Sequence, residues 1–181
     1  MIIFVTGGAR SGKSSYAQRM ALLLSPNPVY VATAKKWGGD FDERIKRHQN
    51  DRGSEWISIE AEKEVSKASI ENKVVVIDCV TLWLTNFFMD HKNNIDKSLE
   101  DFKKEIDVIE KMNGTFIIVS NEIGMGVHAE TDIGRKFTDL QGWANQYIAA
   151  KADKVVLMIS GIPVKIKDLE NGEHLVGSTE A

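Results

Sequence analysis

The residues with the clearest chemistry stand near the start of the chain, in the segment GGARSGKS at positions 7–14. It matches the pattern GxxxxGK[ST], whose glycines let backbone N–H groups wrap around phosphate oxygens. Lys13 is expected to reach the β- and γ-phosphates of a nucleotide, and the Ser14 hydroxyl to coordinate Mg²⁺. The alternative is a glycine-rich turn that binds nothing, but the flanking strand and helix patterns favour the nucleotide site. The predicted site comprises Gly7, Gly8, Ala9, Arg10, Ser11, Gly12, Lys13 and Ser14.

A second candidate for this chemistry is Asp78, near the end of the apolar run at 74–79. A carboxylate at the end of a second strand is well placed to support a Mg²⁺ ion bound to the phosphates. The alternative is an aspartate that only caps the turn after its strand. We predict Ser14 and Asp78 as the metal-supporting residues.

A histidine lies in the charged segment DERIKRHQNDR at 42–52. Helical spacing puts Ile45 and His48 on one face, with Arg44 and Arg52 one turn to either side of His48. A neutral imidazole can attack phosphorus while guanidinium groups hold the anionic phosphates. On spacing alone, a solvated helix with one surface histidine is the preferred interpretation.

The elements that must position these residues follow an alternating pattern of strands and helices. Continuous apolar runs, typical of strands covered on both faces of a parallel sheet, lie at 2–6, 29–33, 74–79, 115–121 and 155–160. Helical stripes lie at 17–24, 95–109 and 133–148. The alternating run at 164–167 follows a turn at 161–163 and predicts an antiparallel edge strand. We predict one three-layer α/β domain over residues 1–181, with its ligands at the carboxyl ends of the strands.

Composition narrows the class of protein. With 181 residues, 27% of them charged, and a net charge of −3, the chain has the size and balance of one globular domain. The interspersed charge argues against a nucleic-acid partner. The single cysteine, Cys79, excludes an internal disulfide. No apolar run is long enough to span a membrane and no leader pattern precedes the first strand, so we expect a cytoplasmic protein.

The chain resembles the bifunctional adenosylcobinamide kinase/adenosylcobinamide-phosphate guanylyltransferase family of cobalamin biosynthesis. The resemblance rests on motifs that stand in the family's order and cover nearly the whole chain: VTGGARSGKSSYA; YVAT, DERIKRHQNDR and EWISIE; VVVIDCVTLWLTNF; and IVSNEIGMGVHAET, LQGWANQ and SGIPVKIK. The phosphate loop is shared by many folds, whereas RHQ-x-x-R together with SNE-x-G-x-G is much more specific. One departure lies at His128-Ala129, where many members carry a proline before the glutamate. It bears only on corrinoid contacts.

The resemblance implies a P-loop fold with a RecA-like parallel sheet, and a homotrimer with sites near its subunit boundaries. It implies that adenosylcobinamide is phosphorylated by a nucleoside triphosphate, and that GMP then passes from GTP to this product through a guanylylated histidine, matched by His48. Mg²⁺ is the expected metal, GTP and ATP are the nucleotides, and adenosylcobinamide and its phosphate are the corrinoid partners. Positions that match nucleotide-contacting segments of the family are Ala32, Thr33, Ala34, Gln49, Asn50, Asp51, Arg52, Glu60 and Asp78.

Two other functions are compatible with a phosphate loop. The first is a kinase of another small alcohol, with His48 merely on the surface. The second is a RecA-like nucleotide switch or assembly module, which would hydrolyse nucleotide slowly and consume no alcohol.

The remaining candidates are ambiguous from sequence. Asn121 and Glu122 follow a buried strand and either face a substrate or fix the turn. The aromatic residues Trp83, Phe87 and Phe88 could face a large corrinoid, but their helical spacing favours the core.

Overall fold

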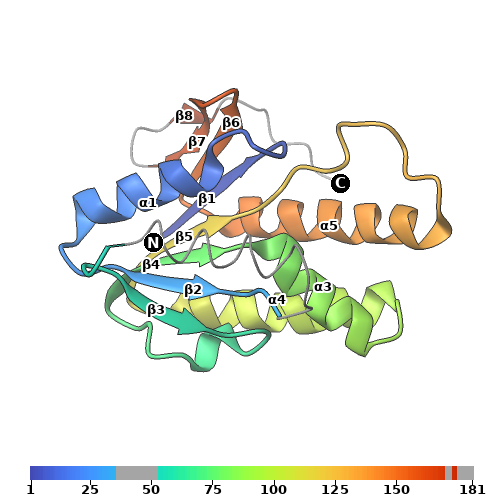
Figure 1. Ribbon diagram of the computed structural model, residues 1–181, viewed down its shortest axis with the longest axis horizontal. Coiled ribbons are helices and arrows are strands. Elements are labelled where there is room, and N and C mark those ends of the chain that lie inside the picture. The colour runs from blue at the N-terminus through green and yellow to red at the C-terminus, as the bar shows by residue number, and fades with distance from the viewer. Residues whose placement is uncertain (36–52, 170–172, 175–181) are drawn as a thin grey trace.

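The computed structural model describes residues 1–35, 53–169 and 173–174. An eight-stranded sheet in the order β3-β2-β4-β5-β1-β6-β7-β8 forms its centre, with helices on both faces (Figure 1). The strands are β1 (Ile2–Gly7), β2 (Val29–Ala32), β3 (Ile57–Glu60), β4 (Lys73–Asp78), β5 (Gly114–Val119), β6 (Lys154–Ile159), β7 (Ile162–Asp168) and β8 (Glu173–His174). The helices are α1 (Lys13–Leu24), α3 (Val80–Asp90), α4 (Ile95–Lys111) and α5 (Asp132–Lys151), with a 3₁₀ turn η1 (Val65–Lys67).

In the order of the sheet, all neighbouring strands from β3 across to β6 are parallel. The pairs β6 with β7 and β7 with β8 are antiparallel. The turn between β6 and β7 consists of Ser160 and Gly161, at φ 50° and 85°. Two positive φ angles suit a two-residue hairpin because its twist then matches that of the strands. The predicted antiparallel edge is confirmed as the pair β7 and β8, with the two-residue β8 outermost.

Different helices cover the two faces of the sheet. Small residues of α1, Ala17 and Ala21, pack on one face against Ile3 and Val5. The opposite face is covered by α3, α4 and α5. The predicted stripes of α4 and α5 supply the buried side chains Phe102, Ile106, Ile109, Leu140, Ala144 and Ile148. At the edge of its stripe Ile133 is 54% exposed, because the first turn of α5 runs past the strands (Figure 1).

The aromatic residues of α3 belong to the core, as their spacing predicted. Trp83, Phe87 and Phe88 are all buried. The Trp83 ring packs edge-on against Phe102 at 5.1 Å between ring centres, and its Nε1 donates to the Lys63 carbonyl at 2.7 Å. Trp83 and Phe88 are therefore core residues, whereas Phe87 also lines a cavity beside β3.

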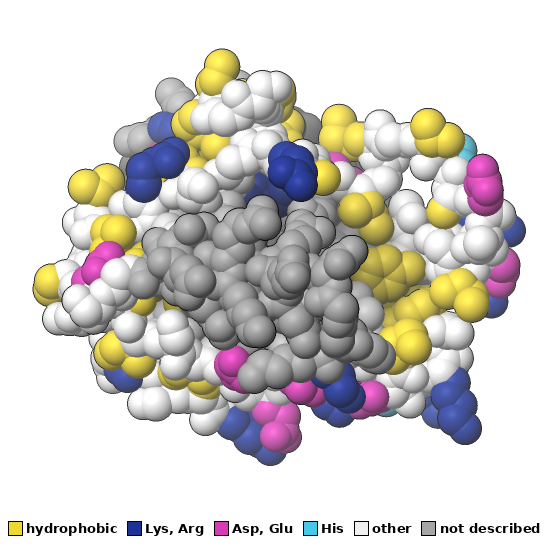
Figure 2. All heavy atoms as spheres, viewed as in Figure 1, with side chains coloured by type: hydrophobic (Ala, Val, Ile, Leu, Met, Phe, Trp, Pro, Cys, Tyr) yellow, Lys and Arg dark blue, Asp and Glu magenta, His cyan; other side chains and the backbone are white. Residues whose placement is uncertain are grey.

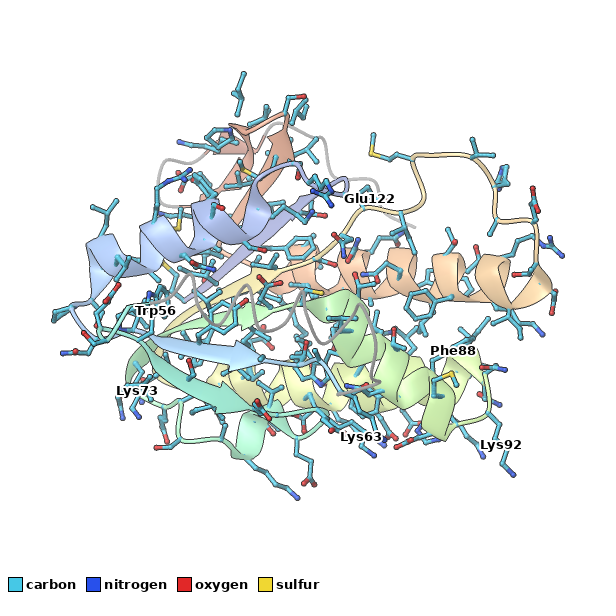
Figure 3. All side chains as sticks on the ribbon, in the orientation of Figure 1. Trp56, Lys63, Lys73, Phe88, Lys92 and Glu122 are labelled. Carbon is cyan, nitrogen blue, oxygen red and sulfur yellow. The ribbon has the colours of Figure 1, made fainter. Side chains whose placement is uncertain are left out.

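The surface in the view of Figure 2 carries basic and acidic side chains close together along its lower edge. Lys63, labelled in Figure 3, pairs there with Asp90, and Lys67 pairs with Glu64. Within the described residues, no helix is long and apolar enough to cross a membrane.

Candidate nucleotide-binding site

The phosphate loop connects the end of β1 to the start of α1. Gly7 and Gly12 have φ angles of 146° and 91°, which side-chain-bearing residues rarely adopt. A Cβ atom on Gly7 would lie 2.5 Å from the Met158 carbonyl oxygen, so β6 packs directly against the loop. A Cβ atom on Gly8 would meet nothing within 4 Å. The loop is thus supported on one side and open on the other, where phosphates are expected.

Backbone hydrogen bonds hold this loop to two neighbouring segments. The Ser11 carbonyl accepts from Gly161 N at 2.9 Å, and the Gly7 carbonyl accepts from Glu122 N at 2.9 Å. The hydroxyl of Ser11 is buried and has no hydrogen-bond partner among the described residues. A buried hydroxyl of this kind gains a partner if a phosphate oxygen reaches it.

Lys13 lies over the loop rather than in solvent. The residue is 7% exposed, and Nζ donates to the Gly8 carbonyl at 2.6 Å. Burial lowers the Lys13 pKa below its ordinary 10.5, and the nearby negative charge of Asp78 opposes that shift. The start of α1 has neither a capping side chain nor an acidic residue in its first turn. The helix N-terminus and Lys13 therefore present positive charge to an anion at the same place.

Asp78, the last residue of β4, belongs to the same site. Its Oδ2 accepts from the Tyr30 hydroxyl at 3.0 Å, and its charge acts on Lys13. Ser14 is half-buried in the first turn of α1, directly after Lys13. A hydroxyl and a carboxylate are hard oxygen ligands of the type that Mg²⁺ prefers, so these two residues fit a magnesium bound to phosphates.

The segment after β2 reaches Asp78. The nucleotide contacts that the resemblance implies for Ala32, Thr33 and Ala34 stay predictions. Thr33 N donates to the Asp78 carbonyl at 3.3 Å, and Thr33 Oγ1 donates to the Cys79 carbonyl at 2.7 Å. The Thr33 side chain is fully buried, so the half-buried Ala32 and Ala34 are the part of this segment that a ligand can touch.

A buried amide fixes that segment from α3. Asn86 Nδ2 donates to the Thr33 carbonyl at 2.8 Å and to the Glu62 carbonyl at 2.7 Å. It joins the loops after β2 and β3, a role that sequence reasoning missed because a single Asn within an apolar helix carries no distinctive pattern.

Glu60 stands apart from the phosphate loop. It ends β3, and three strands separate β3 from β1. Four inter-strand spacings of about 4.8 Å put these strands roughly 19 Å apart. Glu60 instead lines a cavity of about 800 Å³ with Lys63, Phe87 and His91 among its other walls. Its nucleotide contact stays a prediction.

Five of the predicted residues lie outside the described part of the chain: His48, Gln49, Asn50, Asp51 and Arg52. Their roles also stay predictions.

A buried polar network fixes the chain after β5, and sequence reasoning missed it. Gln141 Nε2 donates to Ser120 Oγ at 2.8 Å, and Ser120 Oγ donates to Asn145 Oδ1 at 2.6 Å. Asn145 Nδ2 donates to the Asn121 carbonyl at 3.1 Å, and Asn121 Nδ2 donates to Thr81 Oγ1 at 3.0 Å. The Asn121 side chain therefore fixes the turn. The available signal was a pair of amides, Gln141 and Asn145, four residues apart beside an apolar stripe.

The sequence matches the family described as "Cobinamide kinase / cobinamide phosphate guanyltransferase" over residues 3–166. The chain belongs to this family. It is 35% identical over 182 residues to the "Bifunctional adenosylcobalamin biosynthesis protein CobU" of Escherichia coli, covering 92% of this chain and 100% of that protein. It is 32% identical over 169 residues to the "Bifunctional adenosylcobalamin biosynthesis protein CobP" of Pseudomonas aeruginosa, covering 90% and 95%. The resemblance predicted from the motifs is confirmed.

A solved structure gives independent support for the fold of this cobinamide kinase family member. The ATPase from the type III secretion system of pathogenic bacteria aligns with a TM-score of 0.52 at 8% identity, covering 97% of this chain and 59% of that chain. At so low an identity the likeness shows the fold alone. It confirms the predicted P-loop, RecA-like architecture.

Proposed function

We propose that this chain phosphorylates the aminopropanol hydroxyl of adenosylcobinamide from a nucleoside triphosphate. It then transfers GMP from GTP to that product, which gives adenosylcobinamide-GDP for cobalamin biosynthesis. The observation that carries this proposal is the phosphate loop with its buried Lys13, in a chain that belongs to the cobinamide kinase / cobinamide phosphate guanyltransferase family. The names of the two relatives support both activities.

In the kinase step the loop 7–14 holds the triphosphate. Lys13 Nζ is kept at the Gly8 carbonyl, beside the open side of the loop, so its charge lies close to the β- and γ-phosphates. Ser14 and Asp78 would hold Mg²⁺, which when bound spreads the charge that develops on the transferring group. ATP and GTP are both candidates for the donor.

In the guanylyl step His48 is the proposed nucleophile. Its imidazole forms a bond to the α-phosphorus of GTP and pyrophosphate leaves, which gives a phosphoramidate. A phosphate oxygen of adenosylcobinamide phosphate then attacks the same phosphorus and displaces the imidazole. We assign contacts with the nucleotide to Ala32, Ala34, Glu60 and the segment 49–52, while Thr33 holds its own segment against the end of β4. The family resemblance supports these assignments, and also a cytoplasmic homotrimer with sites near its subunit boundaries.

Labelled GTP tests this proposal. In parallel reactions analysed on denaturing gels, α-labelled GTP should mark the protein and γ-labelled GTP should not, because pyrophosphate leaves with the γ label. The protein–GMP bond should break in acid and survive alkali, and His48→Asn should abolish it. With adenosylcobinamide present, γ-labelled nucleotide should label the corrinoid. If the corrinoid becomes labelled but the protein does not, the chain is a kinase only. If neither becomes labelled, the chain is a nucleotide switch.

A further inference from the structure

The proposed kinase step releases a proton from the attacking hydroxyl, and a carboxylate beside the phosphate loop could accept it. Three candidates stand at the carboxyl ends of the strands: Asp78, Glu60 and Glu122. Asp78 ends β4, two strand positions from β1, and already binds the Tyr30 hydroxyl. Glu60 ends β3, four positions from β1. Glu122 follows β5, which is the direct neighbour of β1, about 4.8 Å away.

The backbone places Glu122 opposite the first glycine of the phosphate loop. Hydrogen bonding between β1 and the chain after β5 continues past Val119: Ser120 N donates to the Val5 carbonyl and Glu122 N to the Gly7 carbonyl, both at 2.9 Å. Figure 3 shows Glu122 at this end of the sheet, beside the carboxyl end of β1. Among the three carboxylates, Glu122 is the one joined directly to the loop.

The network behind Glu122 keeps it in place. Ser120 and Gln141 are fully buried and Asn145 is 7% exposed, so the segment before Glu122 is anchored in the interior by α5. Catalytic groups are effective when their supporting contacts fix them in this manner. Without such contacts, a residue near the start of the 12-residue connection from β5 to α5 (residues 120–131) would have no defined position relative to the loop.

The Glu122 carboxylate retains capacity to accept hydrogen bonds. The side chain is half-buried, and its Oε1 accepts from Gly124 N at 3.1 Å. Among the described residues it forms no ion pair. A carboxylate has about four lone-pair sites, so an incoming hydroxyl can still donate to it.

We propose that Glu122 is the general base of the kinase step, an inference that rests on the proposed function. The acceptor hydroxyl gives its proton to a Glu122 carboxylate oxygen while its own oxygen bonds to the γ-phosphorus. The bond from that phosphorus to the β,γ-bridging oxygen breaks, which releases the nucleoside diphosphate. Protonated Glu122 then returns the proton to solvent. The guanylyl steps use an imidazole and a phosphate oxygen as nucleophiles, with no hydroxyl proton to remove, so they do not require Glu122.

The test compares Glu122→Gln with wild type in both reactions. Glutamine has the same shape and can still accept from Gly124 N, but it cannot take up a proton. We expect the kinase kcat to fall by roughly 10²-fold or more, the range for loss of a general base, with KM for both substrates unchanged. Self-labelling by α-labelled GTP, and transfer to supplied adenosylcobinamide phosphate, should persist. Glu122→Asp should retain part of the kinase activity, because a carboxylate is still present.

Glu71→Gln is the matched control, because Glu71 is exposed just before β4, at the opposite end of the sheet. It should leave both reactions unchanged. Kinase activity retained in Glu122→Gln overturns the inference alone. Equal loss of both reactions also overturns it, since Glu122 would then shape the phosphate loop rather than accept a proton. A wild-type chain that never phosphorylates adenosylcobinamide overturns the proposed function, and this inference with it.

Discussion

Replacing Lys13 by methionine should separate activity from stability, because we propose that the lysine charge serves catalysis and not folding. Methionine keeps most of the apolar stem and removes the ammonium group. Burial is the largest influence on the Lys13 pKa and lowers it, so the protein environment disfavours the charged form even with Asp78 nearby. A bound phosphate would bring the opposite charge that favours the charged form of Lys13.

The size of the activity loss follows from the burial of Lys13. Two unit charges about 4 Å apart, at an effective dielectric constant of about 20, attract by about 4 kcal/mol. At about 1.4 kcal/mol for each factor of ten, that is roughly 10³-fold in rate. Loss of one preorganised donor in other active sites costs about 10²- to 10³-fold. We therefore expect both reactions to fall by roughly 10²- to 10³-fold in Lys13→Met.

In contrast to the activity, the free energy of unfolding of Lys13→Met should stay unchanged or rise. The variant loses the hydrogen bond from Nζ to the Gly8 carbonyl, worth about 1 kcal/mol, and it also loses the cost of burying a charge. The folded-state pKa lies below the unfolded-state value of 10.5, so this cost is present at neutral pH and shrinks as pH rises toward 10.5. Any stability advantage of Lys13→Met should therefore decrease as the pH is raised through the alkaline range.

The assay is urea unfolding at several pH values, combined with γ-label transfer at saturating Mg²⁺. Lys97→Met is the control, since Lys97 is exposed on α4 and only its backbone N–H contacts the Asn94 side chain. Kinase activity within tenfold of wild type in a folded Lys13→Met protein would refute the placement of Lys13 at the phosphates. A loss of more than about 2 kcal/mol of unfolding free energy would contradict the reasoning from burial, because lost hydrogen bonds of this kind cost about 1 kcal/mol.

Two further substitutions examine the residues around the loop. Asp78→Asn should raise the Mg²⁺ concentration needed for half-maximal activity more than it weakens metal-free nucleotide binding; an unchanged requirement in a magnesium titration would leave Asp78 with only its structural contacts. Gln141→Leu removes the amide that donates to Ser120 Oγ at 2.8 Å and to Asn145 Oδ1 at 3.1 Å, so urea unfolding should show a loss of about 1–3 kcal/mol. Unchanged stability in that variant would show that the network contributes nothing to fixing the chain after β5.

Local sequence patterns predicted those parts of the site whose residues are neighbours in the chain. The phosphate loop was predicted at 7–14 because its glycines, Lys13 and Ser14 follow one another in the chain and their geometry is set by neighbouring residues. Most strands and the helical stripes were predicted for the same reason, because the spacing of apolar residues along each element reveals its type. The strand β3 was missed: it has four residues, three of them exposed, so it has no continuous apolar run.

Contacts between distant segments were decided by the tertiary structure alone. Strand order depends on pairings between residues far apart in sequence, and it put β5 between β1 and β4, next to the phosphate loop. That order brought Glu122 to Gly7 and left Glu60 roughly four strand spacings away, although the family motifs associate Glu60, not Glu122, with the nucleotide. Sequence therefore determined which residues can do chemistry on phosphates. The packing of β5 and α5 determined which carboxylate stands beside them, because only folding brings these segments together.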